Sequence, residues 1–256
     1  MLMNIKGLTS IIAALILTAC LPETEISSKN AESILAATAV SNQINETIKV
    51  GVGSQASLAK SLSRMSVRTL GNFNVVDDCQ TSGKYQFTGQ YDDIQDGVTG
   101  DYFLALSQCE TPKGLVEGVI GGSFIALIST GALDIEYSAK GDVDFKAGKQ
   151  TIKVADYSAD ARYSSKAGLD DTIYYKHGGK YNYDTHQYKG TITAQTVTEI
   201  EWRLINGQLS AVQGVVNYTD SAGNVLRVAY NANGVSTYLN TVLLKTYSHA
   251  DWLNKF

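Results

Sequence analysis

Polar and apolar residues alternate along most of the chain with a period of two, which is typical of strands that bury one face. The runs are separated by short stretches of turn residues, so neighbouring strands are expected to pair antiparallel. The pattern predicts strands over residues 73–79, 84–88, 101–109, 115–128, 133–138, 143–145, 151–163, 172–177, 180–188, 191–205, 208–219, 224–230 and 235–244. The fold class is therefore predicted to be mainly β, a large antiparallel meander that forms a sandwich or an open barrel.

Ahead of these strands the apolar residues recur every three or four positions, the period of an amphipathic helix. Asn30 stands where the N-cap of such a helix is expected. Two runs follow the spacing, separated by Gly51 and Gly53: Ile34, Ala37, Val40, Ile44 and Ile48, then Leu58, Leu62 and Met65. We expect a helical segment over residues 31–66, followed by one antiparallel β domain over residues 67–256.

Two glycine-containing dipeptides are predicted to be two-residue hairpin turns. Asn206-Gly207 would set Leu204 opposite Leu209 and Trp202 opposite Ala211 on the core face, with Glu199, Glu201 and Arg203 on the solvent face. Gly178-Gly179 would end one strand at His177 and begin the next at Lys180. The uncharged stretch from residue 118 to residue 133 contains several glycines and is short, which favours a buried strand pair over a membrane span.

The first 20 residues, MLMNIKGLTSIIAALILTAC, place Lys6 ahead of an apolar run from Leu8 to Leu17. This order is typical of a signal peptide. The four residues from Leu17 to Cys20 resemble the lipobox of bacterial lipoproteins, in which a diacylglyceryl group is attached to the cysteine before cleavage ahead of it. The resemblance implies a signal peptide over residues 1–19 and lipidation of Cys20. An ordinary signal peptide with an incidental cysteine and an uncleaved anchor are the alternatives.

Residues 20–30 have no apolar periodicity, so we expect the lipidated cysteine to continue into a polar tether. In lipoproteins of Gram-negative bacteria an aspartate after the cysteine favours retention in the inner membrane. Leu21 occupies that place here, which by the same resemblance implies lipid anchoring in the cell outer membrane, either facing the periplasm or exposed at the surface. Two or three acyl chains would hold the protein at the membrane essentially permanently.

Cys79 and Cys109 remain once Cys20 is lipidated, and an even pair in an oxidising compartment predicts a disulfide. A metal or redox site would need closer cysteine spacing or nearby histidines, whereas His177 is the first histidine in the chain.

The segment from Cys79 to Gly121 resembles a pattern of poorly characterised lipoproteins of gammaproteobacteria. That pattern has a strand with cysteine and glycine, an acidic turn, Gly-Asp, a strand ending in a second cysteine, and a glycine-rich strand. The residues that match are Cys79, Gly83, Asp92, Asp93, Asp96, Gly97, Gly100, Asp101, Cys109 and Gly118. The resemblance agrees with the disulfide and the β architecture and implies no activity.

The composition of the chain excludes one class of binding partner, the polyanions. The chain is 44% apolar and 18% charged, with a formal net charge of −4, so it is neither disordered nor suited to a polyanion such as nucleic acid. A membrane partner through the lipid anchor and an envelope or external protein are the partners we expect. The oligomeric state is left open.

Four aspartates, Asp92, Asp93, Asp96 and Asp101, crowd ten residues and are the one candidate for a calcium site. The spacing does not fit an EF-hand, because Ile94 and Phe103 stand where ligands are required. A solvated acidic turn is the reading we favour, so no metal site is predicted.

Other candidate chemistry is weaker still. His177 and Asp184 are too far apart along the predicted hairpin to share a metal, and Asp184 with His186 makes only two ligands. All three are expected to be polar surface residues of an antiparallel sheet. The GxGxxA match at residues 51–56 lacks a βαβ context, and residues 219–223 contain a serine in a predicted hairpin turn. We predict no catalytic residue and no cofactor, although an extracytoplasmic enzyme with residues drawn from separate strands remains a third hypothesis.

Five tyrosines, Tyr174, Tyr175, Tyr181, Tyr183 and Tyr188, could form a recognition surface, although tyrosine is also a common strand residue. The primary functional hypothesis is a non-catalytic outer-membrane lipoprotein, with a β domain that is structural or binds a partner. The alternative is a carrier of lipid or another apolar ligand in a curved sheet covered by the N-terminal helix. The lipoprotein-sorting proteins of the outer membrane are similar to that arrangement in outline.

Overall fold

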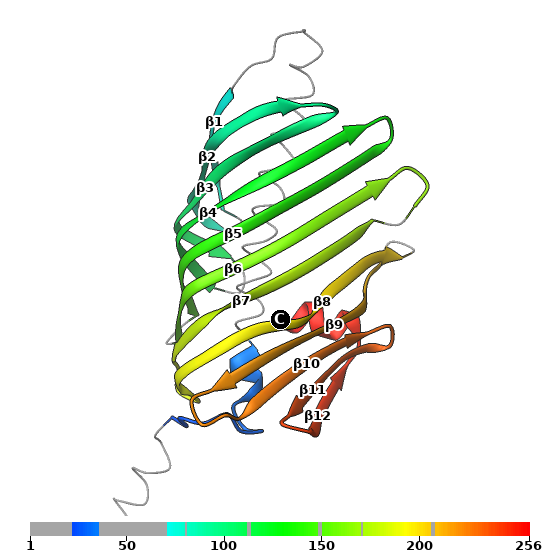
Figure 1. Cartoon of the computed structure of the whole chain (residues 1–256). Coiled ribbons are helices and arrows are strands. Elements are labelled where there is room, and N and C mark those ends of the chain that lie inside the picture. Colours follow the sequence, from blue (N-terminus) through cyan, green and yellow to red (C-terminus); the bar gives the residue numbers. More distant parts are fainter. Residues whose placement is uncertain are drawn as a thin grey trace, which may run out of the picture.

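The computed structural model describes residues 22–35, 71–79, 81–111, 114–147, 150–169, 171–205 and 208–256. These residues form one twelve-stranded antiparallel sheet, in which every strand pairs with the next along the chain (Figure 1). The strands are β1 (Gly71–Asp78), β2 (Ser82–Ile94), β3 (Gly97–Thr111), β4 (Gly114–Ser129), β5 (Ala132–Ala147), β6 (Gln150–Lys166), β7 (Thr172–Asp184), β8 (Lys189–Ile205), β9 (Gln208–Asp220), β10 (Val225–Asn231), β11 (Gly234–Leu239) and β12 (Val242–Tyr247). The prediction of a mainly β meander is confirmed, as a single curved sheet in the described part of the chain rather than as a sandwich.

The predicted strand boundaries are wrong in several places. Gly178-Gly179 is not a turn, because β7 runs through it: both glycines pair in register with Gln195 and Ala194 of β8, and Gly179 falls within a register shift against β6. Residues 133–138 and 143–145 belong to one strand, β5, whereas the predicted strand 235–244 is divided by a turn at Asn240. The register of the predicted hairpin at Asn206-Gly207 is confirmed, since Leu204 lies opposite Leu209 and Trp202 opposite Ala211. The predicted faces are wrong for two residues, because register shifts precede Trp202: Leu204 is exposed and Glu201 is buried.

The inner face of the sheet, defined as the face that carries its buried side chains, is rich in aromatic residues. A row of rings crosses the first four strands: Phe73 lies 5.1 Å from Phe87, Phe87 lies 5.2 Å from Tyr102, and Tyr102 lies 6.5 Å from Phe124 between ring centroids. Such cross-strand ring contacts add to the free energy gained by burial of apolar area. The aromatic row thus ties β1 to β4 on the inner face.

Glycines allow the sheet to bend. A Cβ atom on Gly122 would stand 1.8 Å from the carbonyl oxygen of Ser138, and one on Gly141 would stand 2.2 Å from that of Val119. Both contacts join β4 and β5, and both involve backbone that cannot rotate away. Since any side chain would force the two strands apart, glycine at these positions is required for the curvature seen in Figure 1.

Gly122→Ala should therefore destabilise the fold by about 3 kcal/mol or more, as an overpacked site that only a backbone shift can relieve. Gly121→Ala is the matched control, because its Cβ would meet only the ring edge of Phe103, at 3.0 Å. Urea unfolding of the two variants measures the difference. Equal stability of both variants would show that the close approach of β4 and β5 does not constrain the sheet.

Residues 23–35 pack on the sheet, and the prediction of a polar tether over residues 20–30 is wrong for residues 23–30. Glu23 forms a parallel bridge with Tyr188, its N–H donating to the carbonyl of Gln187 at 3.1 Å and its carbonyl accepting from Lys189 at 2.8 Å. Ile26 is buried, and its backbone N–H donates to the Asp220 carboxylate at 2.7 Å. Local polarity hid this docking from the sequence pattern, because its partners are almost 200 residues away.

Residues 31–35 are helical, in agreement with the start of the predicted helical segment. The Asn30 side-chain oxygen accepts from the N–H of Ser27 at 2.9 Å, so it closes the turn ahead of the helix. Ile34 is fully buried, and its carbonyl accepts from the Tyr183 hydroxyl at 2.7 Å. The remainder of the predicted helical segment, residues 36–66, lies outside the described residues.

A C-terminal helix, α3 (His249–Lys255), was not predicted from the pattern because it is only seven residues long. Ser248 caps it by accepting from the N–H of Asp251, and Trp252 packs edge-on against Tyr230 and Tyr247. Figure 1 places α3 and the segment of residues 22–35 behind the strands, on the inner side of the curve. Both chain ends of the described domain therefore cover the same part of the inner face.

Glu32 ties these two coverings together. Its carboxylate lies 2.6 Å from the ammonium of Lys255, accepts from the Tyr247 hydroxyl at 3.0 Å and accepts from Lys245 at 3.2 Å. The Lys255 contact is the largest reason that the pKa of Glu32 falls to about 2, against the opposing effect of partial burial. The carboxylate therefore stays ionised at neutral pH and holds the N-terminal segment to α3 and β12.

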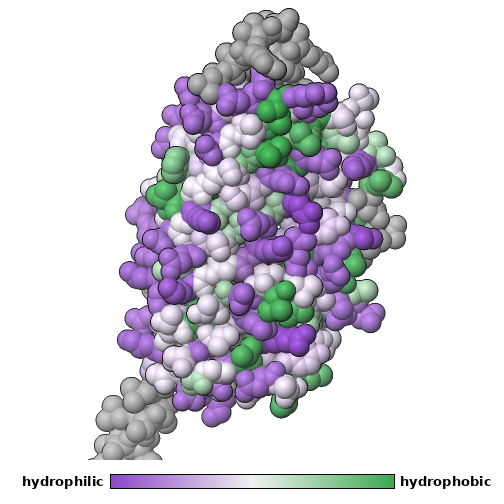
Figure 2. All heavy atoms as spheres, in the orientation of Figure 1, coloured by the Kyte–Doolittle hydropathy of each residue, from purple (hydrophilic) through white to green (hydrophobic). Residues whose placement is uncertain are grey.

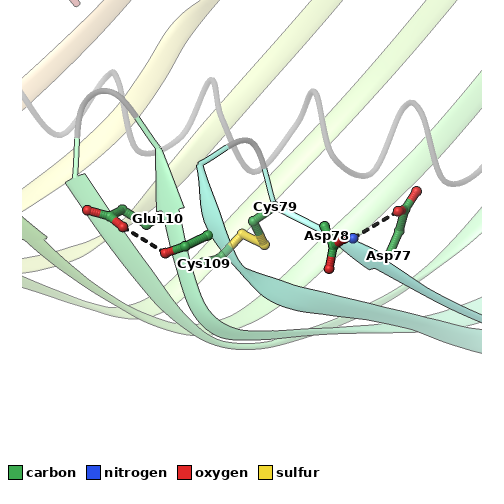
Figure 3. Close-up of a disulfide and its surroundings, with 6 residues drawn as sticks. Asp77, Asp78, Cys79, Cys109 and Glu110 are labelled. Carbon is green, nitrogen blue, oxygen red and sulfur yellow. Dashed lines mark hydrogen bonds between the residues drawn. A yellow bond between two sulfur atoms is a disulfide. The ribbon is translucent and has the colours of Figure 1, made fainter.

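The predicted disulfide is confirmed: Cys79, just after β1, is bonded to Cys109 on β3, with 5.3 Å between the Cα atoms (Figure 3). Gly83 of β2 accepts from the N–H of Cys79 at 3.1 Å, and a Cβ on Gly83 would stand 1.8 Å from the carbonyl oxygen of Gln108, the residue before Cys109. Ser82 donates to Glu110 beside the bond. Closing this 30-residue loop is worth about 3–4 kcal/mol through the unfolded state.

Candidate functional site

The outer face of the sheet carries a groove over β4 to β8, with a volume of about 560 Å³. Outward-facing side chains from five strands line it, among them Ser123, Glu136, Asp160, Arg162, Lys176 and Glu199. Ser123 and Ser138 bring their hydroxyls within 3.1 Å across β4 and β5. The groove is open to solvent, so it suits a surface contact better than the enclosure of a small molecule.

Charges of both signs alternate along this groove. Arg162 donates to Glu199 at 2.8 Å, Lys176 lies 3.8 Å from the other oxygen of Glu199, and the guanidinium of Arg162 stacks over the Tyr174 ring at 4.7 Å. These pairs are partly exposed, and ion pairs of this kind contribute little to stability. They hold the side chains in defined positions, which is what a polar contact to a partner requires.

An apolar patch adjoins the groove on the same face; it consists of Ile94, Phe103, Val119, Ile125 and Leu127. Phe103 is 60% exposed and Val119 56% exposed. In the strand register Gly97 lies between Ile94 and Leu127, and Gly121 lies opposite Phe103. The pair of Asp101 and Ser123 lies between Phe103 and Ile125, so the patch has two parts: Phe103 with Val119, and Ile94 with Ile125 and Leu127. Figure 2 shows this face, with apolar side chains in separate clusters, one of them over the upper strands, among polar ones.

The patch and the groove together are chemically unusual for the exposed face of a sheet. Wet faces of antiparallel sheets are usually polar, so five large apolar side chains on one such face call for an explanation. An apolar centre with charged and hydroxyl-bearing neighbours is the usual composition of a non-obligate protein interface. Alternation along single strands is the signal that places Phe103 and Val119 on the outer face, and the prediction of a buried strand pair over residues 118–133 is wrong for Val119, Ile125 and Leu127.

The four aspartates of the calcium candidate do not converge. Asp92 lies opposite Thr99, Asp93 opposite Val98 and Asp101 opposite Gln90, while Asp96 occupies the β2–β3 turn with a φ of 61°. Neighbouring residues of a strand point to opposite faces, which separates Asp92 from Asp93. Over the ranges that the structure describes, no three His, Cys, Asp or Glu side chains are placed to hold a metal ion.

His177 is buried on the inner face, contrary to our expectation of a polar surface residue. Its ring stacks on Tyr175 at 5.2 Å between centroids, and its Nε2 lies 3.4 Å from the Tyr218 hydroxyl. Burial lowers the pKa of His177 to about 4. Asp184 and His186 are exposed at the end of β7, so the structure gives no common site to the three residues.

The five tyrosines do not form a recognition surface. Tyr175, Tyr181, Tyr183 and Tyr188 are buried, and only Tyr174 faces the groove side of the sheet, under Arg162. Burial raises the pKa of Tyr188 to about 12 and holds that of Tyr183 well above its ordinary value. Both hydroxyls stay protonated, and that of Tyr183 donates to the carbonyl of Ile34 at 2.7 Å.

The serine-containing segment of residues 219–223 is a further candidate from the sequence. Residues 219–223 lie at a hairpin turn, as predicted, in which Asp220 accepts from the N–H groups of Ala222 and Asn224 at 2.9 and 2.8 Å. Burial acts to raise the pKa of Asp220, but these bonds and the one from Ile26 outweigh it and lower the pKa. Cys20, the signal peptide and the GxGxxA match at residues 51–56 lie outside the described residues.

No helix in the described ranges is long and apolar enough to cross a membrane. Comparison with protein families, with curated proteins and with solved structures finds no match to this chain. The described residues form a single curved antiparallel meander, with a disulfide that joins the end of β1 to β3. The resemblance of residues 79–121 to lipoproteins of gammaproteobacteria stays a prediction.

The low pKa of His177 makes stability depend on pH. Between pH 6.5 and 4 the unfolded chain binds a proton at this ring that the folded state excludes, so the free energy of unfolding should fall by up to about 3 kcal/mol as pH is lowered through this window. His177→Gln should remove this part of the slope, whereas His186→Gln, at an exposed turn, should keep it. Urea unfolding at several pH values measures both, and identical slopes for wild type and His177→Gln would contradict the assignment.

Proposed function

We propose that this protein is a non-catalytic lipoprotein of the bacterial outer membrane, and that its outer face binds a protein partner of the envelope or the exterior. The observation that carries the binding part is the apolar patch beside the charged groove. The LTAC sequence at Cys20 supports the lipid anchor, and the Cys79–Cys109 disulfide supports an oxidising compartment.

The patch and the groove would make different contributions to such an interface, the patch to affinity and the groove to selectivity. Phe103 and Val119 offer apolar area that a partner would remove from water, and an aromatic residue at the centre of an interface commonly carries much of the binding free energy. Arg162, Lys176 and Glu199 form an adjoining charged border. Contacts with that border would select the partner and its orientation more than they would add affinity.

Substitution of the patch tests the binding surface. In cells carrying the full chain, the double variant Phe103→Ser and Val119→Ser should lower the yield of a specific crosslinked partner at least about tenfold, since two apolar contacts are lost. Val197→Ser is the matched control, because Val197 is equally exposed, at 59%, but belongs to β8. Unchanged yield from the double variant, or no specific product from wild type, would contradict the proposal.

A carrier of lipid or another apolar ligand is the second candidate. It is favoured by the curvature of the sheet and by its aromatic inner face, one part of which residues 26–35 and α3 cover. A ligand would have to occupy that inner face by displacing a cover. Delipidated protein that extracts lipid from vesicles would support the carrier, and a protein that extracts none would exclude it.

A further inference from the structure

The docking of Glu23 sets how far the folded domain can lie from Cys20. Only Leu21 and Pro22 separate Cys20 from Glu23, whose backbone is bonded on both sides to the turn between β7 and β8. Three residues span at most about 11 Å when fully extended. A lipid on Cys20 would thus hold this turn within about 11 Å of the bilayer surface.

Hydrogen bonds join this turn to two more turns at the same end of the sheet. Ile26, three residues after Glu23, donates to Asp220 at the start of the β9–β10 turn. Val225, which ends that turn, accepts from the N–H of Asn240 at 2.7 Å and donates to the Asn240 side chain at 2.9 Å, in the β11–β12 turn. We call residues 185–188, 221–224 and 240–243 the anchor-side rim.

The exposed surface of this rim is suited to a lipid headgroup layer. Val242 is 65% exposed and Leu243 54% exposed, and Ala222 and Gly223 are exposed in the neighbouring turn. Lys189 lies 3.5 Å from Asp184 beside the rim, so their charges largely cancel. The rim contains no Lys, Arg, Asp or Glu, and its exposed residues are neutral polar ones beside small and apolar ones: His186, Gln187, Ser221, Asn240 and Thr241, then Ala222, Gly223, Val242 and Leu243.

We propose that the anchor-side rim lies against the membrane surface, with Val242 and Leu243 in contact with lipid headgroups. This inference rests on the proposed lipidation of Cys20. Two acyl chains hold the protein at the bilayer, and the short connection from Cys20 keeps the rim close to it. The apolar side chains of the rim then only select the orientation of the domain. The strands then rise from the membrane, and the outer face with its apolar patch stands open to a partner.

Two alanines at opposite ends of β10 provide a matched pair of reporters. Ala222 belongs to the anchor-side rim, Ala232 to the turn at the far end, and both are exposed. The seven residues of β10 separate them by about 23 Å at 3.3 Å per residue. An environment-sensitive fluorophore on Ala222→Cys or Ala232→Cys, with the native disulfide left oxidised, reports which end meets lipid.

The acylated full-length variants are reconstituted in vesicles of phosphatidylethanolamine and phosphatidylglycerol that carry a headgroup quencher. We expect quenching of the residue-222 label at least threefold stronger than that of the residue-232 label. Equal quenching, or stronger quenching at residue 232, overturns the orientation. Intact mass of the same samples reports acylation separately, so a protein without acyl chains refutes the lipid anchor and is distinguishable from a wrong orientation.

Lengthening the connection tests its role. A ten-residue glycine-serine insertion between Pro22 and Glu23 extends the reach by about 35 Å and leaves every described contact of the domain in place. The difference between the two labels should fall to less than half of its original value. A contrast that survives the insertion in full would show that the short connection does not orient the domain.

Discussion

The bond between the backbone N–H of Ile26 and the Asp220 carboxylate joins two parts of the chain that are 194 residues apart. Asp220 uses its other oxygen to close the β9–β10 turn through Ala222 and Asn224, so the turn and the N-terminal segment share one carboxylate. The lowered pKa of Asp220 means that the carboxylate is charged at neutral pH, the state in which it accepts these bonds most strongly. The position of the chain's N-terminal segment relative to the sheet depends on this contact.

The apolar face of a single twelve-stranded sheet has to be shielded from water by other parts of the chain. The sheet curves around the chain segments that pack on its inner face. At the β8–β12 end these segments are residues 26–35 and α3. Glycines at the β4–β5 contact permit the bend, and Glu32 joins the two covering segments through Lys255. The outer face is left free to carry the groove and the apolar patch.

The sequence pattern predicted those features of the fold that depend on residues close together in the chain. Alternation predicted the antiparallel meander, Asn206-Gly207 predicted a register that the structure has, and cysteine parity predicted the disulfide. It failed where distant residues decide the outcome. The polarity of residues 23–30 hid their docking, and Gly178-Gly179 signals a turn equally well whether the chain reverses or forms a bulge. The outer-face site escaped prediction because its residues come from five strands, and no local pattern links Arg162 to Glu199.

The account depends most on residues 23–35 being part of the folded domain. Hydrogen–deuterium exchange of the Ile26 amide, followed by NMR in the intact protein at neutral pH, tests this directly. The account predicts exchange as slow as that of the β8 and β9 amides around Thr193 and Tyr218, because opening this bond requires Asp220 to be left buried without its partner. Exchange of Ile26 at the rate of an unstructured peptide, while the strands stay protected, would contradict it.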